Sequence, residues 1–338
     1  MHCRSTSEQR LLQLDSPAHA LIVANTRSIV KRFRATVDAA PAATFGAVGT
    51  RVALVTGASR GIGKASAIAL AGAGFDVAIA ARTMHEGEGR DAIEPDRVLV
   101  GSLDATLEAI RATGQRVLPI RLDLLDKASW RRAVEEVLGE WGRVDVLVNN
   151  GRHQAHDHKA RFADVELDTL EAELDANLLA PVVLAKAVVP GMLERGTGTI
   201  VNVTSGAGYR APDSTADKGG WSTSYALAKG GLQRLAPMIA LELGDRGINA
   251  FNLNPGFVIT EKNEARIAAL GMDRHSGARP PVPAAVVAWL ATDPGAGELN
   301  GCTINAQPFA LERSLCPDWR ADPSVPPSGD TESVIRGI

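Results

Sequence analysis

The chain has 338 residues, 45% of them hydrophobic and 22% charged, with a formal net charge of −3 at pH 7. This composition is ordinary for a globular protein with a sizeable core, and the lack of long single-sign charge runs argues against a nucleic-acid or anionic-membrane partner. Cys3, Cys302 and Cys316 lie far apart without the spacing of a zinc site, which predicts a reduced, cytoplasmic protein. We also expect no membrane span, since no uninterrupted apolar stretch has the length that a bilayer requires.

Residues 1–48 differ in composition from the rest of the chain. Basic residues outnumber acidic ones there, with Arg4, Arg10, Arg27, Lys31, Arg32 and Arg34 against Glu8, Asp15 and Asp38. A basic, acid-poor leader is typical of an organellar transit segment. A partly helical appendage, or a start codon assigned too early, would give the same composition. We therefore treat 1–48 as an N-terminal extension, followed by a domain over 49–310 and a tail over 311–338.

From Arg51 onward, apolar strands alternate with helical patterns. In chain order we expect a strand at 52–55, a helix at 64–71, a strand at 77–80, a helix at 102–114, a strand at 117–120, a helix at 128–141 and a strand at 144–148. Residues 85–96 are polar and contain glycine, which predicts a surface loop after the second strand.

The second half continues the alternation with a helix at 167–193, a strand at 199–203, a helix at 222–243 and a strand at 248–253. Pro181, Pro190 and Pro237 fall inside or near the ends of these helices, where each removes a backbone donor and predicts a kink. Strands this uniformly apolar are buried on both faces of a parallel sheet. The pattern predicts an α/β fold, a doubly wound Rossmann-type sheet in a single domain. The proline-rich tail from Pro317 predicts a mobile arm.

A glycine-rich turn falls between the first strand and the first helix, with the sequence Thr56-Gly57-Ala58-Ser59-Arg60-Gly61-Ile62-Gly63. Glycines let the backbone turn sharply and approach a pyrophosphate, which then sits at the positive end of the helix. The spacing is G-x-x-x-G-x-G rather than the G-x-G-x-x-G of the standard dinucleotide fingerprint. A tight turn without a ligand is the alternative, but the position after the first buried strand favours nucleotide binding.

The end of the second strand bears on the choice of nicotinamide cofactor. Proteins that prefer NAD carry an acidic residue there, which accepts a hydrogen bond from the ribose. This chain has Ala80-Ala81-Arg82 instead, and Arg60 lies in the glycine turn. Two guanidiniums near the ribose 2′ position suit a phosphate, so we expect NADP(H) in preference to NAD(H). The alternative is that Arg82 is only a solvated surface charge.

Ser205, Tyr225 and Lys229 suggest acid–base chemistry. Tyr225 and Lys229 lie four positions apart, so a helix places them on one face. A nearby ammonium favours the charged form of a phenol, which makes the phenol a usable proton donor and acceptor near neutral pH. Ser205 follows an apolar strand. Each residue alone is explained by a strand end or a surface pair, but their order after the glycine turn favours a catalytic site.

A histidine-rich segment, His153, His156 and His158 with Asp157, raises the question of a metal site. The spacing is irregular and no cysteine or distant histidine completes a ligand set, so we expect no metal. A solvated loop, or a polar contact with the substrate through His153 or Arg152, is the better explanation.

Together these motifs resemble the short-chain dehydrogenase/reductase family over about residues 51–305. The glycine turn resembles the family's Thr-Gly-x-x-x-Gly-x-Gly, and Asn149-Asn150-Gly151 resembles its Asn-Asn-Ala-Gly element. By this resemblance the catalytic tetrad is Asn177, Ser205, Tyr225 and Lys229. The residues that it implies for cofactor binding are Thr56, Gly57, Ser59, Arg60, Gly61, Ile62, Gly63, Arg82, Asp123, Leu124, Asn150, Gly151, Tyr225, Lys229, Pro255, Gly256, Val258 and Thr260.

The resemblance implies the strand order 3-2-1-4-5-6-7, a homodimer or homotetramer, and reversible hydride transfer between NADP(H) and a carbonyl/secondary-alcohol pair. It implies that Tyr225 donates the proton, that Ser205 steadies the carbonyl oxygen and that Lys229 binds the nicotinamide ribose. Asn177 would hold a water linking Lys229 to solvent. An epimerase or dehydratase, which shares the Tyr-x-x-x-Lys pair, and an NADP-binding regulator without turnover are the alternatives.

The chain departs from the family pattern in three places. Gly151-Arg152 replaces Ala-Gly, the separation between Ser205 and Tyr225 is longer than usual, and the sequence ends the domain without a glycine-rich close. None of these changes removes a group that the reaction needs. The segments 210–221 and 260–281 are expected to form the substrate rim, and their mixed polarity names no single small-molecule substrate.

Overall fold

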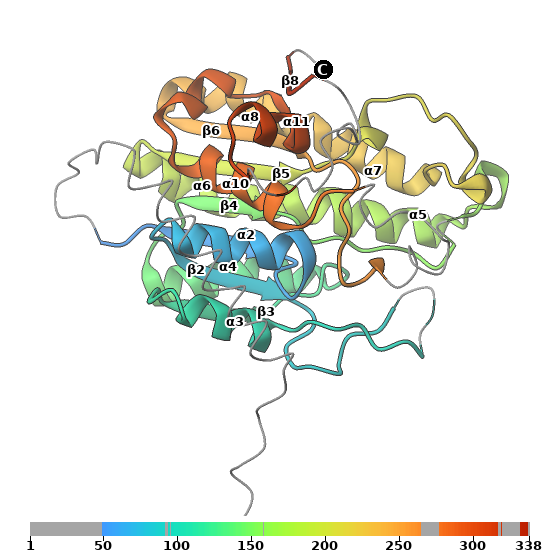
Figure 1. Ribbon diagram of the computed structural model, residues 1–338, viewed down its shortest axis with the longest axis horizontal. Coiled ribbons are helices and arrows are strands. Elements are labelled where there is room, and N and C mark those ends of the chain that lie inside the picture. Colours follow the sequence, from blue (N-terminus) through green and yellow to red (C-terminus); the bar gives the residue numbers. More distant parts are fainter. Residues whose placement is uncertain are drawn as a thin grey trace, which may run out of the picture. The chain divides into compact units, whose positions relative to one another are not determined.

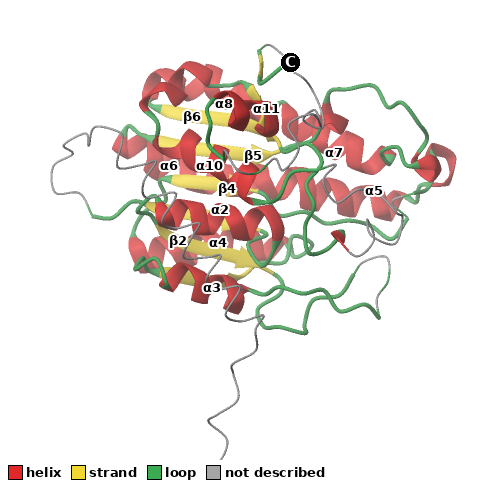
Figure 2. Cartoon of the chain, in the orientation of Figure 1, coloured by secondary structure: helices red, strands yellow, loops and turns green. Residues whose placement is uncertain are grey.

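The computed structural model describes residues 49–91, 94, 96–157, 159–264, 277–316, 319 and 332–336. Within these residues an eight-stranded sheet is covered by helices on both faces (Figures 1 and 2). The N-terminal extension over 1–48, with any targeting role, lies outside the described residues, as does most of the tail after Pro317.

The strands are β1 Val52–Thr56, β2 Asp76–Ala81, β3 Val117–Arg121, β4 Val146–Asn149, β5 Gly198–Val203, β6 Ile248–Asn254, β7 Thr303–Asn305 and β8 Val334–Ile335. They lie in the order β3-β2-β1-β4-β5-β6-β7-β8. Each neighbouring pair from β3 to β7 is parallel. The doubly wound parallel sheet and its order are therefore confirmed.

The eighth strand corrects the expectation that the whole tail is a mobile arm. Val334–Ile335 pair antiparallel with β7, and the backbone N–H of Asn305 donates to the Ser333 carbonyl at 2.9 Å. A strand of two residues has no periodicity from which it can be predicted, so the proline content around it dominated the sequence pattern.

The helices are α2 Gly61–Gly72, α3 Leu103–Arg111, α4 Lys127–Trp141, α5 Leu167–Leu174, α6 Ala180–Arg195, α7 Thr223–Gln233, α8 Leu235–Leu243, α10 Pro281–Thr292 and α11 Ala306–Glu312. Alternate residues of β1 point into opposite layers. Ala53 and Val55 pack with α2, α3, α10 and α11, whereas Val52 and Leu54 pack with α4, α6 and α8. The core is thus divided between the two faces of the sheet.

The long predicted helix contains a local widening. A π-helical turn over Asp175–Leu179 joins α5 to α6. Pro181 lacks the N–H that would bind the Asn177 carbonyl in a regular α-helix, which accounts for a widened turn at this point. Such π-turns are frequent at functional sites.

This continuous helical stretch also corrects one expectation about membranes. By length and composition alone, Leu167–Arg195 meets the criterion for a membrane-crossing helix, with a mean hydropathy of 1.7. Leu184, Val188 and Met192, however, are buried against the sheet with α4. A core helix of an α/β domain is apolar for this reason, and the packing identifies the stretch as such a helix.

The helix predicted after Ser222 is divided in two. Ser222 Oγ accepts a hydrogen bond from the N–H of Tyr225 at 3.3 Å and caps α7. Pro237 has no N–H for the Gln233 carbonyl, which accepts instead from Asn252 Nδ2 at 2.7 Å. The proline therefore coincides with the break between α7 and α8, and a β6 side chain satisfies the carbonyl.

Candidate active site

A cavity of about 850 Å³ opens at the carboxyl ends of β1, β4, β5 and β6. In doubly wound sheets this is the edge at which ligands bind. Every residue predicted for the site lines the cavity except Thr56, Gly63 and Asn177. The structure therefore brings the glycine turn and the residues predicted for catalysis to one place.

The glycine turn permits close backbone packing at one end of the cavity. Gly57 has a φ of +66°, and a Cβ there would lie 2.7 Å from the Cα of Gly151. A Cβ on Gly63 would lie 2.3 Å from the Gly57 carbonyl oxygen. Both glycines are needed for the tight contact between β1, α2 and the loop after β4, whether or not a ligand binds.

The start of α2 already holds an anionic group. The Gly61 N–H donates to Glu261 Oε2 at 2.9 Å. Gly61 lines the cavity, and Glu261 comes from the segment that follows β6. A helix N-terminus favours negative charge, so this carboxylate occupies the kind of position that a phosphate would take.

Thr56 and Asn150 join the ends of β1 and β4. Thr56 Oγ1 accepts from the N–H groups of Asn150 and Gly151 at 3.0 and 2.9 Å. Asn150 Nδ2 donates to the carbonyls of Thr56 and Gly57 at 2.9 and 3.3 Å. Thr56 therefore shapes the cavity by holding two strand ends together.

The two arginines predicted for the ribose phosphate differ in their surroundings. Arg60 Nε and Nη2 donate to the carbonyls of Val100 and Gly101 at 2.9 and 2.7 Å. Burial is the main cause of its lowered pKa. Arg82, directly after β2, is exposed and lines the cavity. The expectation of two available guanidiniums is therefore corrected, because Arg60 is already engaged in holding the loop after β2.

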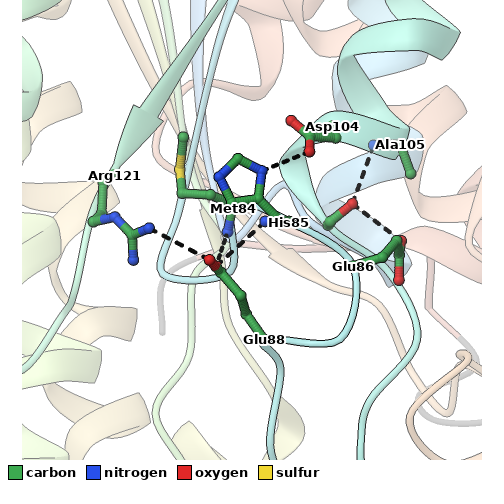
Figure 3. A network of polar contacts seen from close by, with 8 residues as sticks. Met84, His85, Glu86, Glu88, Asp104, Ala105 and Arg121 are labelled. Atoms are coloured by element: carbon green, nitrogen blue, oxygen red, sulfur yellow. Dashed lines mark hydrogen bonds and ion pairs between the residues drawn. The ribbon is translucent and has the colours of Figure 1, made fainter. Parts of the chain in front are cut away.

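The part of that loop next to α3, predicted as a surface loop, is held by side-chain contacts. Figure 3 shows its polar network. Glu88 Oε2 accepts from the N–H groups of Met84 and His85 at 2.9 and 3.3 Å, and His85 Nδ1 lies 2.7 Å from Asp104 Oδ2. The hydrogen bond to Asp104 raises the pKa of His85. These contacts fasten the loop to the start of α3.

Further along, the same loop borders the cavity. Its lining residues are Arg90, Asp91, Glu94, Arg97 and Leu99. Arg97 Nη2 donates to the Lys262 carbonyl at 3.2 Å, so the loop also meets the segment after β6. No pattern in the sequence signals this role, because a polar loop has no periodicity that separates a solvated loop from one that lines a pocket.

Ser205, Tyr225 and Lys229 all line the cavity. Ser205 follows β5, and its Oγ accepts from the Ala207 N–H at 3.2 Å. Lys229 Nζ donates to the Val203 carbonyl at 2.7 Å. This bond requires α7 to approach the turn after β5, Gly206–Gly208, closely. Glycine at position 208 allows the approach, because a Cβ there would lie 2.7 Å from the Lys229 carbonyl oxygen.

Lys229 is buried, and burial is the main cause of the lowering of its pKa from 10.5 to about 7. The charge of Arg152 lowers it further, and the charge of Glu173 raises it. An amine with a pKa near neutrality can gain and lose a proton at working pH.

Asn177 lies behind the cavity lining and is bonded to the loop after β4. Its Oδ1 accepts from the His153 N–H at 2.8 Å, and its Nδ2 donates to the His153 carbonyl at 3.0 Å. Asn177 Nδ2 also donates to Glu173, whose other carboxylate oxygen accepts from the Ala155 N–H at 2.9 Å. Sequence reasoning missed Glu173, although its position one turn before Asn177 placed it on the same helix face.

Arg152, the residue that replaces a family glycine, stacks on the tyrosine. Its guanidinium carbon lies 4.3 Å from the centre of the Tyr225 ring. Two positions later in the loop, Gln154 Oε1 accepts from Lys262 Nζ at 2.9 Å. All four of these side chains line the cavity.

The segments after β6 and β3 supply the remaining predicted lining residues, Pro255, Gly256, Val258, Thr260, Asp123 and Leu124. Gly256 has a φ of +65°, and its N–H donates to Asn254 Oδ1 at 3.2 Å. Asp123 Oδ1 accepts from the Leu125 N–H at 3.0 Å. Both turns are therefore held by local side-chain bonds.

Among the residues that the structure describes, no group of three or more His, Cys, Asp or Glu side chains is placed to hold a metal ion. His158, one member of the histidine-rich segment, lies outside them.

The chain is similar in sequence to known dehydrogenases and reductases. Residues 51–270 match the sequence model of the family described as short chain dehydrogenase. A cyclohexanol dehydrogenase of Rhodococcus sp. (strain TK6) is 32% identical over 65% of this chain and 79% of its own. A 3-oxoacyl-[acyl-carrier-protein] reductase of Synechocystis is 31% identical over 77% of this chain and 96% of its own.

A solved structure of a 3-oxoacyl (acyl-carrier-protein) reductase from Agrobacterium tumefaciens C58, with NADP bound, has a TM-score of 0.63 and 26% identity. The match covers 75% of this chain and 92% of the reductase. With the sheet order, the glycine turn and the cavity, these matches show that the chain is an NAD(P)-dependent oxidoreductase of the short-chain dehydrogenase/reductase family.

Proposed function

We propose that the protein catalyses reversible hydride transfer between NADP(H) and a carbonyl/secondary-alcohol pair, with Tyr225 as general acid and base. The observation that carries the proposal is that Ser205, Tyr225 and Lys229 line one cavity together with the glycine turn. The bound cofactor supplies the hydride, and the protein orients and polarises the substrate.

The side chains divide the work of carbonyl reduction. The hydroxyl of Tyr225 donates a proton to the carbonyl oxygen as charge develops there, and the Ser205 hydroxyl donates a hydrogen bond to the same oxygen. Lys229, with its pKa of about 7, returns a proton to the tyrosine. Asn177 holds a water that connects Lys229 to solvent, and Glu173 fixes the amide of Asn177.

The residues present fit a dinucleotide. The Gly61 N–H accommodates a carboxylate, which supports phosphate binding at the start of α2. Arg82 stands after β2 where proteins that prefer NAD carry an acidic residue, which supports NADP(H) over NAD(H). The NADP bound to the Agrobacterium reductase is compatible with this preference.

We also propose that the protein is a cytoplasmic homodimer or homotetramer that acts on a small molecule rather than on nucleic acid or a membrane. Exposed apolar side chains of the π-turn, α7 and α8 support self-association: Leu179, Leu227, Met238 and Leu241. Neither Cys302 nor Cys316 forms a disulfide among the described residues, which is compatible with a reducing compartment.

The test is oxidation of NADPH and of NADH, followed by absorbance, with a panel of ketones, aldehydes, quinones and oxoacyl thioesters. We expect turnover with at least one carbonyl class and a lower KM for NADPH than for NADH. Tight NADPH binding without turnover on any member would instead favour a regulator that binds the cofactor.

A further inference from the structure

One charged group in the cavity has no assigned partner, the guanidinium of Arg152. Among the described residues, no carboxylate lies within ion-pair distance of it and no hydrogen bond to it is found; its close contact is the Tyr225 ring at 4.3 Å. Two other arginines that line the cavity are engaged, Arg60 with two carbonyls and Arg97 with a third, and the exposed Arg82 is assigned above to the 2′-phosphate. Arg152 is therefore a cation that the fold leaves available beside the proposed proton donor.

Neighbouring charges make this end of the cavity receptive to an anion. Burial is the main cause of the lowered pKa values of Lys229 and Lys262, and the charge of Arg152 lowers both further, whereas the charge of Asp91 raises that of Lys262. Lys262 Nζ is held by a neutral acceptor, Gln154. Glu173 is the acidic group near Lys229, but its carboxylate is buried and is bonded to the Ala155 N–H and to a side-chain amide.

The cofactor does not account for this cation in the proposed arrangement. Its pyrophosphate is expected at Gly61, and its 2′-phosphate at Arg82. Arg152 lies instead over the ring whose hydroxyl would bind the carbonyl oxygen. An anion in contact with its guanidinium therefore belongs to the substrate.

We propose, on the basis of the function proposed above, that Arg152 is a specificity-determining residue that binds a carboxylate of the substrate, so that the site acts on oxo acids and hydroxy acids. The planar guanidinium matches a carboxylate with two parallel hydrogen bonds. Because the guanidinium lies over the Tyr225 ring, the carboxylate that it binds is held beside the proposed proton donor.

The experiment compares matched pairs of substrates, 2-oxobutanoate and acetoacetate with their methyl esters, on the wild type, Arg152→Met and Arg152→Lys. We expect Arg152→Met to lower kcat/KM for the carboxylates about 10- to 100-fold, the loss of a charge-assisted hydrogen bond. The same variant should change the values for the esters less than about threefold, since they offer no anion. Arg152→Lys should give intermediate values with the carboxylates, because the charge remains but the fork is lost.

Arg82→Met is the matched control, with the same substitution at the arginine proposed to bind the 2′-phosphate. It should raise the KM for NADPH and leave the ratio of carboxylate to ester activity unchanged. An equal loss on acids and esters in Arg152→Met would overturn the proposal, since Arg152 would then act on Tyr225 itself. A weakened NADPH Kd with an unchanged acid-to-ester ratio would overturn it too.

The wild type separates this inference from the proposed function. If it reduces esters and neutral ketones but shows no preference for carboxylates, only the role of Arg152 fails. If it reduces no carbonyl compound at all, the proposed function fails, and this inference fails with it.

Discussion

Two parts of the cavity are built by different kinds of contact. The inner end is the part lined by Ser205, Tyr225 and Lys229, and the rim is formed by the loops after β4 and β6. At the inner end, Lys229 is 4% exposed and its ammonium is bonded to the β5 backbone. At the rim, the contacts are charged side chains on loops, such as Glu261 on the Gly61 N–H and Lys262 on Gln154. The inner end is therefore fixed by the buried sheet, whereas the rim is held by bonds that a ligand can replace.

This difference sets what substitutions do at each place. A substitution at the inner end removes a group that touches the reacting atoms or alters a buried charge. Its effect on the rate or on the stability is therefore large. A change at the rim alters the affinity for a ligand that competes with existing contacts, and the effect is modest. The largest effects are therefore expected from substitutions at the inner end.

Tyr225→Phe removes the proposed proton donor and retains the ring under Arg152. We expect kcat/KM for the best carbonyl substrate to fall by about 10²- to 10⁴-fold, the usual contribution of general acid catalysis. Quenching of protein fluorescence by NADPH should give a Kd within about threefold of the wild type, because no phosphate contact is lost. Retention of a tenth or more of the activity would refute the assignment of Tyr225 as the acid.

Lys229→Met should stabilise the cofactor-free protein in a pH-dependent way. Burial holds the pKa of Lys229 at about 7 in the folded state, below its ordinary value of 10.5, so the unfolded chain binds the proton more tightly. Burying the charged lysine therefore lowers the free energy of unfolding, and the whole of this cost is present below pH 7. The cost disappears as pH rises from about 7 to 10.5.

The expected gain for Lys229→Met is about 1–3 kcal/mol in the free energy of unfolding at pH 6, after allowance for the lost bond to the Val203 carbonyl. Urea unfolding of both proteins at pH 6, 8 and 10 measures it. A difference that stays constant across this range would show that Lys229 is charged throughout in the folded protein. Lys186→Met, on the exposed side of α6, is the control and should change little.

The same contrast explains what the sequence predicted. The strands and the Tyr225-to-Lys229 spacing carry local periodicity, so the sheet and the grouping of the inner residues followed from the chain. Glu173 and Arg60 did not, because their roles depend on backbone groups of other loops that meet them only in the folded state. The division between α7 and α8 was signalled by Pro237, but its exact place depends on a side chain from β6.

Glu173 joins the inner end to the rim, since it bonds both Asn177 and the loop after β4. Glu173→Gln should lower kcat about tenfold, because the new amide cannot accept from both of its donors and one is left unsatisfied at a cost of about 1–3 kcal/mol. Loss of its charge should also move the alkaline limb of the pH–rate profile for carbonyl reduction to lower pH, because protonated Lys229 supplies the proton and Glu173 raises its pKa.

Rates measured from pH 5 to 9 test both effects of Glu173→Gln. Glu171→Gln removes an exposed carboxylate from the same helix and should leave the rate and the profile unchanged. A lower rate with an unshifted profile would mean that Glu173 acts only through the position of the loop and not through its charge.

Glu261 offers the smallest and most specific test of the rim. Its carboxylate lies on the Gly61 N–H, where a cofactor phosphate is expected, so the cofactor must displace a group of like charge. Glu261→Gln should therefore lower the Kd for NADPH about 3- to 10-fold, with little effect on kcat, because the competing charge is removed while the inner end is untouched. Glu264→Gln, which removes the partner of Arg279 a few residues away, is the control and should leave the Kd unchanged. Weaker NADPH binding in Glu261→Gln would instead show that Glu261 keeps its place beside the bound cofactor and supports the turn, and the rim would then be as fixed as the inner end.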